Sequence, residues 1–265
     1  MNQIKLIVSD LDGTLLTDNK EIDTNIKKVI KELESIGILF TIATGRNNSQ
    51  SKHIINELGI DIPYVCDNGG SIFKKGYCIK DYGINFDDIV TVNSIFEKYK
   101  VPHVVYGFNN KYGRMMTDRI KYFFEVAKAL NKVEDLNELR NDIVVKITVD
   151  SNGVKDFLKA KKEVDERCKN VNFRRSEDTL FTVTDIKSSK GNAVEYLANN
   201  LGLSLNNVMT FGDNYNDLTM IEKASIGVAM EDAKDEIKNA SEYVASSNNK
   251  NGVSNFLIDY FKLKI

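Results

Sequence analysis

Tryptophan is absent from this 265-residue sequence, which also has only two prolines, two histidines and three cysteines. The two histidines, His53 and His103, lie far apart, so a zinc site built from histidines is not expected. The cysteines form no C-x-x-C pair, and their odd number indicates reduced thiols in a cytoplasmic protein.

Long apolar runs are missing as well. No run approaches the roughly 18 residues that a membrane-spanning helix needs. Lys5 interrupts the first apolar run and Asp10 ends it, so the N-terminus lacks the apolar core of a signal peptide. The sequence therefore predicts no membrane association.

An excess of charge of one sign is the third absence. Lysine and arginine total 36 and aspartate and glutamate total 38, which gives a formal net charge of −2. This balance argues against a dedicated nucleic-acid-binding protein. Hydrophobic residues make up 42% and charged residues 28%, as in ordinary globular proteins, and the length allows one large domain or two smaller ones. The composition does not indicate an oligomeric state.

Short apolar runs alternate with amphipathic segments along much of the chain. Ile4–Ser9, Ile38–Ala43 and Val208–Phe211 predict strands, and the segment between a possible Asp23 cap and Gly37 has the apolar spacing of a helix. This alternation predicts an α/β fold, with a largely parallel sheet covered by helices on both faces.

The pattern changes in the middle of the chain. Residues 83–187 have helical and strand patterns of their own and are numerous enough for a separate core. We therefore expect an α/β domain at 83–187, inserted into a domain formed by residues 1–82 and 188–265.

The first candidate site is Asp10-Leu11-Asp12-Gly13-Thr14, directly after the first predicted strand. Carboxylates at i and i+2 leave an extended strand on the same side, and the glycine permits a sharp turn. One carboxylate could bind a divalent cation and attack an electrophile, while the other transfers protons. A charged turn is the alternative interpretation.

Two further candidate segments contain groups that bind phosphate oxygens. Thr44-Gly45-Arg46 follows the second predicted strand and offers a hydroxyl and backbone N–H groups close to a helix start. Lys190-Gly191 begins a predicted helix, where a lysine opposes the helix dipole. On the sequence alone, a simple strand-to-helix turn and a solvated lysine stay the commoner interpretations.

The fourth candidate segment is Phe211-Gly212-Asp213-Asn214-Tyr215-Asn216-Asp217, at the end of another predicted strand. Asp213 and Asp217 could complete an oxygen-rich site for Mg²⁺. The alternative is that Asp213 or Asn216 caps the next helix. Taken together, the four segments suit phosphoryl transfer, in which a metal ion and a lysine neutralise phosphate charge.

These segments resemble motifs I to IV of the haloacid dehalogenase superfamily of phosphatases. The similarity covers essentially the whole chain and is greatest to the Cof-type subfamily. It implies a Rossmann-like core with an inserted α/β cap domain. The residues that carry it are Asp10–Thr14, Ala43–Arg46, Asp67–Gly70, Lys190–Ala193, Gly212–Met220 and Gly227–Met230.

The resemblance also implies a mechanism. Asp10 would be the nucleophile that forms an aspartyl-phosphate, and Asp12 would protonate the leaving alcohol and then deprotonate the hydrolytic water. Mg²⁺ would bind the Asp10 carboxylate, the Asp12 backbone carbonyl and Asp213, with Asp217 beside it directly or through water. The phosphate would be held by the backbone at Leu11 and Gly45 and by the side chains of Thr44, Lys190 and Asn216.

The leading prediction is therefore a Mg²⁺-dependent phosphatase that acts on small phosphorylated metabolites, most of all sugar phosphates. One alternative is a phosphomutase or other phosphotransferase on the same scaffold, which would retain the phosphoenzyme and shield it from water. Another is a non-catalytic phosphate-binding or regulatory protein, although binding alone would not need both Asp10 and Asp12. A receiver-like signalling domain is disfavoured by the length and the large insertion.

Overall fold

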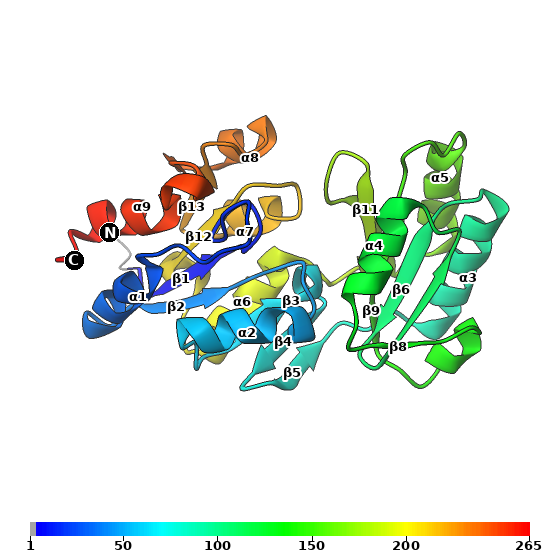
Figure 1. Cartoon of the computed structure of the whole chain (residues 1–265), viewed down its shortest axis with the longest axis horizontal. Coiled ribbons are helices and arrows are strands. Elements are labelled where there is room, and N and C mark those ends of the chain that lie inside the picture. The colour runs from blue at the N-terminus through cyan, green and yellow to red at the C-terminus, as the bar shows by residue number, and fades with distance from the viewer. Residues whose placement is uncertain (1–3) are drawn as a thin grey trace. The chain divides into compact units, whose positions relative to one another are not determined.

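The computed structural model describes residues 4–265, which fold into two compact units. The first comprises the described residues up to Lys80 together with Ser189–Ile265, and the second comprises Asp81–Ser188. Each unit has its own sheet (Figure 1). Over residues 4–265, no helix combines the length and the apolar character needed to cross a bilayer.

The first unit is built on a five-stranded sheet with the order β14-β13-β12-β1-β2, in which every pair of neighbours is parallel. Its strands are β1 (Leu6–Ser9), β2 (Leu39–Ile42), β12 (Val208–Gly212), β13 (Ile226–Met230) and β14 (Tyr243–Ala245). A bridge between Ala43 and Val65 leads from β2 to a small sheet formed by β3 (Tyr64–Cys66), β4 (Ser71–Lys74) and β5 (Tyr77–Asp81).

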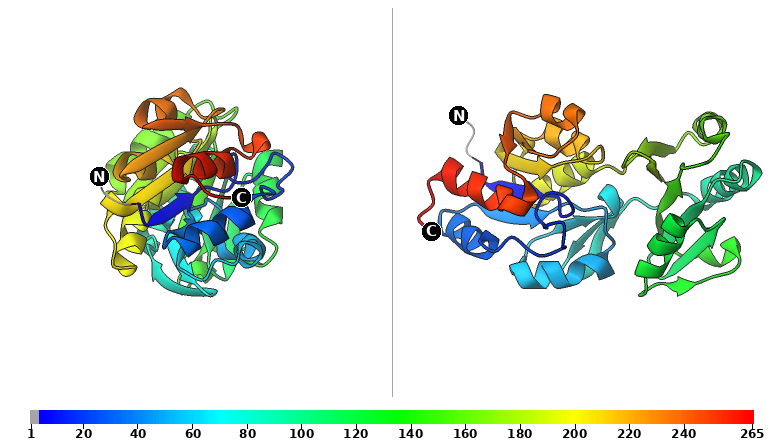
Figure 2. Two further views of the ribbon diagram at one scale, coloured as in Figure 1. Left: turned by 90° about the vertical axis from the view of Figure 1, so that its left-hand side faces the viewer. Right: turned by 45° about the horizontal axis from the view of Figure 1, so that its top comes forward.

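Helices cover both faces of the parallel sheet, as the sequence predicts. Helices α6 (Lys190–Asn200) and α7 (Leu218–Lys223) pack together, and apolar residues of both join Leu6 and Val8 in one core. Helices α1 (Ile26–Ser35) and α9 (Gly252–Phe261) contact each other (Figures 1 and 2), and the right-handed β1–α1–β2 crossover places them on the opposite face. The unit is completed by α2 (Asn48–Leu58) and α8 (Asp235–Ala240).

The strand order explains where the sequence motifs meet. Leu6, Ile7 and Val8 are all fully buried, as expected of a central parallel strand with helices on both sides. Because β12, β1 and β2 are neighbours and parallel, their carboxyl ends lie along one edge of the sheet. Ligands bind at this edge in open α/β sheets.

The second unit contains a six-stranded sheet with the order β10-β11-β9-β6-β7-β8. Helices α3 (Phe86–Lys98) and α5 (Phe157–Arg167) pack on the face that includes Val105, while α4 (Asp118–Val126) packs on Val104 and Tyr106. Adjacent residues of β6 thus contribute to the cores on opposite faces of this sheet. The strands are β6 (His103–Gly107), β7 (Asn110–Arg114), β8 (Asn131–Lys132), β9 (Val144–Asp150), β10 (Val171–Arg175) and β11 (Leu180–Asp185).

The predicted N-cap of the first helix was wrong. Helix α1 has Asn25 as its N-cap, and Asp23 instead accepts the Asn25 backbone N–H at 2.8 Å before the helix begins.

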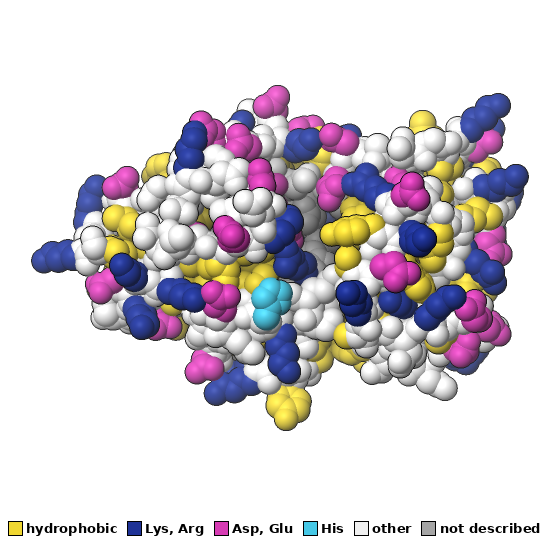
Figure 3. All heavy atoms as spheres, viewed as in Figure 1, with side chains coloured by type: hydrophobic (Ala, Val, Ile, Leu, Met, Phe, Trp, Pro, Cys, Tyr) yellow, Lys and Arg dark blue, Asp and Glu magenta, His cyan; other side chains and the backbone are white. Residues whose placement is uncertain are grey.

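The surface carries charges of both signs. Figure 3 shows basic and acidic side chains interspersed over the face in view. The mixed surface agrees with the formal net charge of −2.

Of the three cysteines, Cys66 and Cys168 are buried and Cys78 is exposed, and all three are free thiols.

Candidate active site

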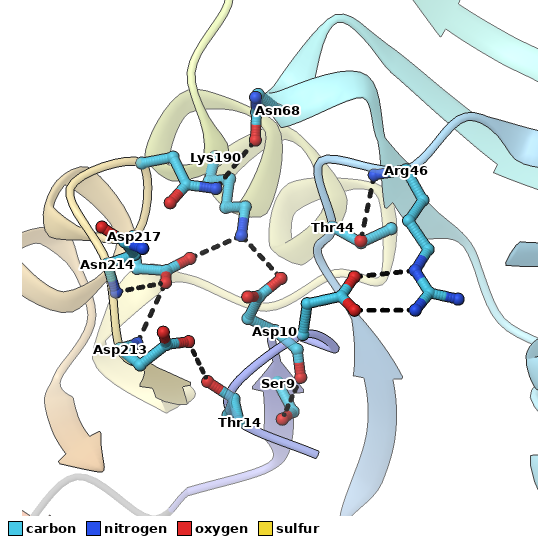
Figure 4. A network of polar contacts seen from close by, with 12 residues as sticks. Ser9, Asp10, Thr14, Thr44, Arg46, Asn68, Lys190, Asp213, Asn214 and Asp217 are labelled. Atoms are coloured by element: carbon cyan, nitrogen blue, oxygen red, sulfur yellow. Dashed lines mark hydrogen bonds and ion pairs between the residues drawn. The ribbon is translucent and has the colours of Figure 1, made fainter. Parts of the chain in front are cut away.

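The predicted site segments converge at the carboxyl edge of the parallel sheet (Figure 4). Asp10 follows β1, and its backbone N–H donates a hydrogen bond of 3.0 Å to the carbonyl of Phe211 on β12. Asp213 follows β12, and Thr44 follows β2 by two residues. Residues from three neighbouring strands therefore share one site.

Lys190 is the central cation of this site. Its Nζ lies 2.7 Å from Asp10 Oδ1 and 2.5 Å from Asp217 Oδ1. The lysine is only 1% exposed and Asp10 only 5%, so the solvated-lysine interpretation is wrong. Burial acts to lower the pKa of Lys190, but the two carboxylates outweigh it and raise that pKa. Lys190 therefore stays charged.

Asp213 contacts the segment Asp10–Thr14 through Thr14 and Gly13. Thr14 Oγ1 donates a hydrogen bond of 2.8 Å to Asp213 Oδ1. Gly13 has a φ of +82°, and a Cβ at that position would lie 2.5 Å from Asp213 Oδ2. Both the left-handed backbone and the close approach of the carboxylate thus require glycine at position 13.

Three carboxylates form a cluster that suits a divalent cation. One oxygen each from Asp10, Asp213 and Asp217 lies within 4.8 Å of the others. When all three carboxylates and Lys190 are ionised, the formal charge of the site is −2, the complement of a doubly charged ion. Burial raises the pKa of Asp10 and that of Asp213, and the neighbouring carboxylates raise them further although Lys190 lowers both, so that the pKa of Asp213 reaches about 7. The cluster therefore has more negative charge than Lys190 alone neutralises. Hard oxygen donors of this kind fit Mg²⁺.

Mg²⁺ is expected to raise the melting temperature, and to raise it more above pH 7 than below. Because the pKa of Asp213 is raised in the folded state to about 7, its contribution to stability is present at acid pH and lost as pH rises through that value. Bound Mg²⁺ would offset this loss above pH 7. Below pH 7, Mg²⁺ competes with protons for the Asp213 carboxylate and should stabilise the protein less. Thermal melts recorded about one pH unit above and about one pH unit below the Asp213 pKa, with and without Mg²⁺, measure the effect. Equal shifts at both pH values would contradict it.

Asp217 also shapes its own loop. Its Oδ2 accepts hydrogen bonds of 3.0 Å from the backbone N–H groups of Asp213 and Asn214. The N-cap of α7 is Asp217 itself, and it makes no side-chain capping hydrogen bond. Neither Asp213 nor Asn216 caps this helix, so the capping interpretation of these two residues was wrong.

Asp12 lies beside two cations. Arg46 Nε and Nη2 each lie 2.7 Å from one of its carboxylate oxygens, and Lys20 Nζ lies 2.8 Å from Oδ1. Burial acts to raise the pKa of Asp12, but the hydrogen bonds and charges of Arg46 and then Lys20 lower it to about 2. At neutral pH Asp12 is therefore a carboxylate, the form that accepts a proton.

The Arg46→Ala variant is expected to raise the pKa of Asp12 from about 2 toward the ordinary 3.8, because it removes the strongest influences that lower it. Carboxyl carbon shifts, followed by NMR between neutral and acid pH without Mg²⁺ and assigned with Asp12→Asn, would report this pKa. Lys20→Ala is the matched comparison. It should give a smaller rise, because Lys20 makes a single contact and its side chain is 59% exposed. An Asp12 pKa unchanged in Arg46→Ala would contradict the account.

The predicted phosphate-binding residues lie around this cluster. Thr44 is buried, and its Oγ1 accepts a hydrogen bond of 3.1 Å from the Arg46 backbone N–H. The carbonyl of Leu11 accepts the backbone N–H of Leu15 at 3.0 Å, which shapes the loop after β1. Gly45 and Asn216 both lie against one further side chain, that of Asn68. The phosphate-binding roles of these residues stay predictions.

Four residues contact the site residues through side chains for which the sequence analysis predicted no role, namely Thr14, Lys20, Arg46 and Asn68. Thr14 and Arg46 belong to segments singled out from the sequence, and Asn68 begins the conspicuous Asn68-Gly69-Gly70 turn. Nothing in the sequence around Lys20 indicates its contact with Asp12.

Comparison with known proteins gives matches along nearly the whole chain. A family model described as haloacid dehalogenase-like hydrolase matches residues 7–257. The chain is 29% identical over 287 residues to the 5-amino-6-(5-phospho-D-ribitylamino)uracil phosphatase YwtE of Bacillus subtilis (strain 168), with 96% of this chain and 97% of the relative covered.

Solved structures match the fold over a similar extent. A haloacid dehalogenase-like hydrolase from Bacteroides thetaiotaomicron superposes with a TM-score of 0.84 at 24% identity, covering 98% of this chain and 100% of that one. The HAD subclass IIB sugar phosphatase BT4131 superposes with a TM-score of 0.81 at 25% identity, covering 97% and 99%.

Proposed function

The chain belongs to the haloacid dehalogenase-like hydrolases and is a phosphatase of that family, and we propose that it uses Mg²⁺ to hydrolyse small phosphorylated metabolites, sugar phosphates first among them. One observation carries the proposal. Asp10 lies buried beside Lys190 at the carboxyl end of β1, within one cluster with Asp213 and Asp217. In this proposal residues 1–82 and 188–265 are the catalytic core, and residues 83–187 are the cap domain.

Asp10 is the proposed nucleophile. Its Oδ1 is held by Lys190, while no hydrogen bond to its Oδ2 is found among residues 4–265. One carboxylate oxygen is therefore oriented and the other is available for attack on phosphorus. The new bond joins this oxygen to phosphorus as the bond from phosphorus to the ester oxygen breaks. Lys190 would neutralise negative charge on the phosphoryl oxygens.

Asp12 is the proposed acid and base. In the first step a protonated Asp12 gives its proton to the departing alkoxide. In the second it removes a proton from water, whose oxygen attacks phosphorus and releases phosphate and free Asp10. The contacts with Arg46 and Lys20 hold Asp12 in its base form. The Asp12 carboxylate must therefore separate from these two cations before it can take up the proton that it donates in the first step.

We assign the metal to the carboxylates of Asp10 and Asp213 and the backbone carbonyl of Asp12, with Asp217 beside them directly or through water. Mg²⁺ held there would neutralise the charge of the transferring phosphoryl group. The site's own formal charge of −2 and its oxygen donors support this assignment. Thr44, Asn216 and the backbone at Leu11 and Gly45 are the proposed remaining phosphate ligands.

A substrate panel tests the proposed substrate class. Phosphate release would be measured from sugar phosphates, nucleotides and a chromogenic aryl phosphate, each with Mg²⁺ and with EDTA. We expect the highest kcat/KM among the sugar phosphates. A clear preference for nucleotides would overturn the assignment to sugar phosphates, and a phosphoenzyme burst followed by slow hydrolysis would favour a phosphomutase.

A further inference from the structure

The turn after β3 has an unusual backbone. Asp67 and Asn68 have φ values of 55° and 58°, and Gly69 follows with 94°, so three successive residues lie in the left-handed region. Residues other than glycine rarely adopt this conformation, although asparagine and aspartate tolerate it better than most. Such strain persists only where the surroundings enforce it.

The turn is fixed between two segments of the candidate site. The backbone N–H of Asn68 donates to the carbonyl of Thr44 at 3.0 Å, and that of Asp67 donates to the carbonyl of Arg46 at 2.9 Å. On the other side, a Cβ on Gly69 would overlap the carbonyl group of Ser189, the residue before Lys190. The strained backbone therefore holds the Asn68 side chain at a defined place.

That side chain connects two predicted phosphate ligands. Asn68 Oδ1 accepts a hydrogen bond of 2.9 Å from Asn216 Nδ2, and a Cβ on Gly45 would lie 2.9 Å from the same oxygen. Figure 4 shows the Asn68 oxygen directed toward this contact between segments that are 148 residues apart in the chain.

The contact decides which end of the Asn216 amide is presented to an anion. An amide has a donating and an accepting end, and only the donating end attracts phosphate oxygens. Because one N–H of Asn216 is bound to Asn68, its amide is fixed and the second N–H of the same nitrogen remains for another acceptor. Without Asn68, the Asn216 amide could rotate and present its oxygen.

We propose that Asn68 is a positioning residue for the phosphate site, which acts by orienting the Asn216 amide. The proposal rests on the proposed function, since it assumes that Asn216 binds the phosphoryl group. It adds to the site a residue whose role depends on a strained turn and a contact between distant segments.

The test is a double-mutant cycle of Asn68→Gly and Asn216→Ala. Glycine removes the side chain and suits the left-handed backbone, so the turn should keep its conformation and the variant should fold, which a thermal melt would check. The inhibition constant of inorganic phosphate and kcat/KM for an aryl phosphate would be measured with Mg²⁺. Lys75→Gly is the matched control, because Lys75 also has a left-handed φ of 51° but lies in the exposed turn between β4 and β5, at the end of β4 opposite the Asn68 turn.

We expect Asn68→Gly to weaken phosphate binding and kcat/KM by about threefold to tenfold, the range for a lost hydrogen bond. In the Asn216→Ala background the same change should cost less than about twofold, because its target is gone. Lys75→Gly should change neither constant. Equal losses in both backgrounds, or no loss in either, would overturn the positioning role. A wild-type protein that neither hydrolyses esters nor binds phosphate would overturn the proposed function and this proposal with it.

Discussion

Asp10→Asn is expected to reduce kcat by a factor on the order of 10⁴ or more, the scale seen when a nucleophile is removed. The amide keeps the shape of the carboxylate and can still accept a hydrogen bond from Lys190, which in the wild-type protein contacts Asp10 Oδ1 at 2.7 Å. The amide is, however, a poor nucleophile and has no charge to attract a metal ion. The loss should therefore appear in turnover and not in the fold.

Stability measurements separate these effects. Burial and the neighbouring carboxylates raise the pKa of Asp10, so its charge opposes folding at neutral pH without metal. Asp10→Asn should consequently be at least as stable as the wild type in EDTA. Asp61→Asn makes the same chemical change at a side chain that is 86% exposed and should leave kcat within about twofold. Turnover by purified Asp10→Asn within tenfold of the wild type would contradict the nucleophile assignment.

Lys190→Met is expected to lower the free energy of unfolding at neutral pH by about 3–5 kcal/mol without Mg²⁺, because it leaves buried carboxylates without their cation. Asp10 and Asp217, whose side chains are 7% and 0% exposed, both lose the ammonium group. The pKa of Asp10 should rise further, so the deficit should shrink as the pH falls and Asp10 is protonated. Urea unfolding near pH 7 and near pH 5 would measure it.

Lys223→Met is the matched control for this prediction. Lys223 pairs with Glu195 at 2.7 Å, but the two side chains are 38% and 45% exposed. Its loss should cost less than about 1 kcal/mol, as is usual for surface pairs. Lys190→Met should also lower kcat/KM on the order of 10²-fold to 10³-fold, through the lost charge next to the phosphoryl group. A Lys190→Met variant as stable as Lys223→Met would contradict the structural account.

The convergence of the site could be predicted from the sequence because it follows from strand direction. Asp10, Thr44 and Asp213 each follow an apolar run, and parallel neighbouring strands bring the ends of such runs to one edge. The surroundings of Lys190 could not be predicted in this way. Its burial depends on how α6 packs against β1 and α7, which no local pattern in the sequence encodes.

Contacts between distant residues were also missed. Arg46 and Asp12 are 34 residues apart, and the pair depends on the path of two loops. Strand β7 (Asn110–Arg114) escaped prediction because it is mostly polar. The structure accommodates it by burying Lys111, whose Nζ donates to the carbonyls of Phe124 and Ala127 at the end of α4.

The most direct test of the account is phosphate release from a sugar phosphate, measured with Mg²⁺, after chelation with EDTA, and with Asp10→Asn. The account predicts release by the wild-type protein that stops with EDTA, returns with excess Mg²⁺ and is absent in the variant. Release that continues in EDTA, or in Asp10→Asn, would contradict it. So would a folded protein that binds Mg²⁺ but releases no phosphate from any sugar phosphate, nucleotide or aryl phosphate.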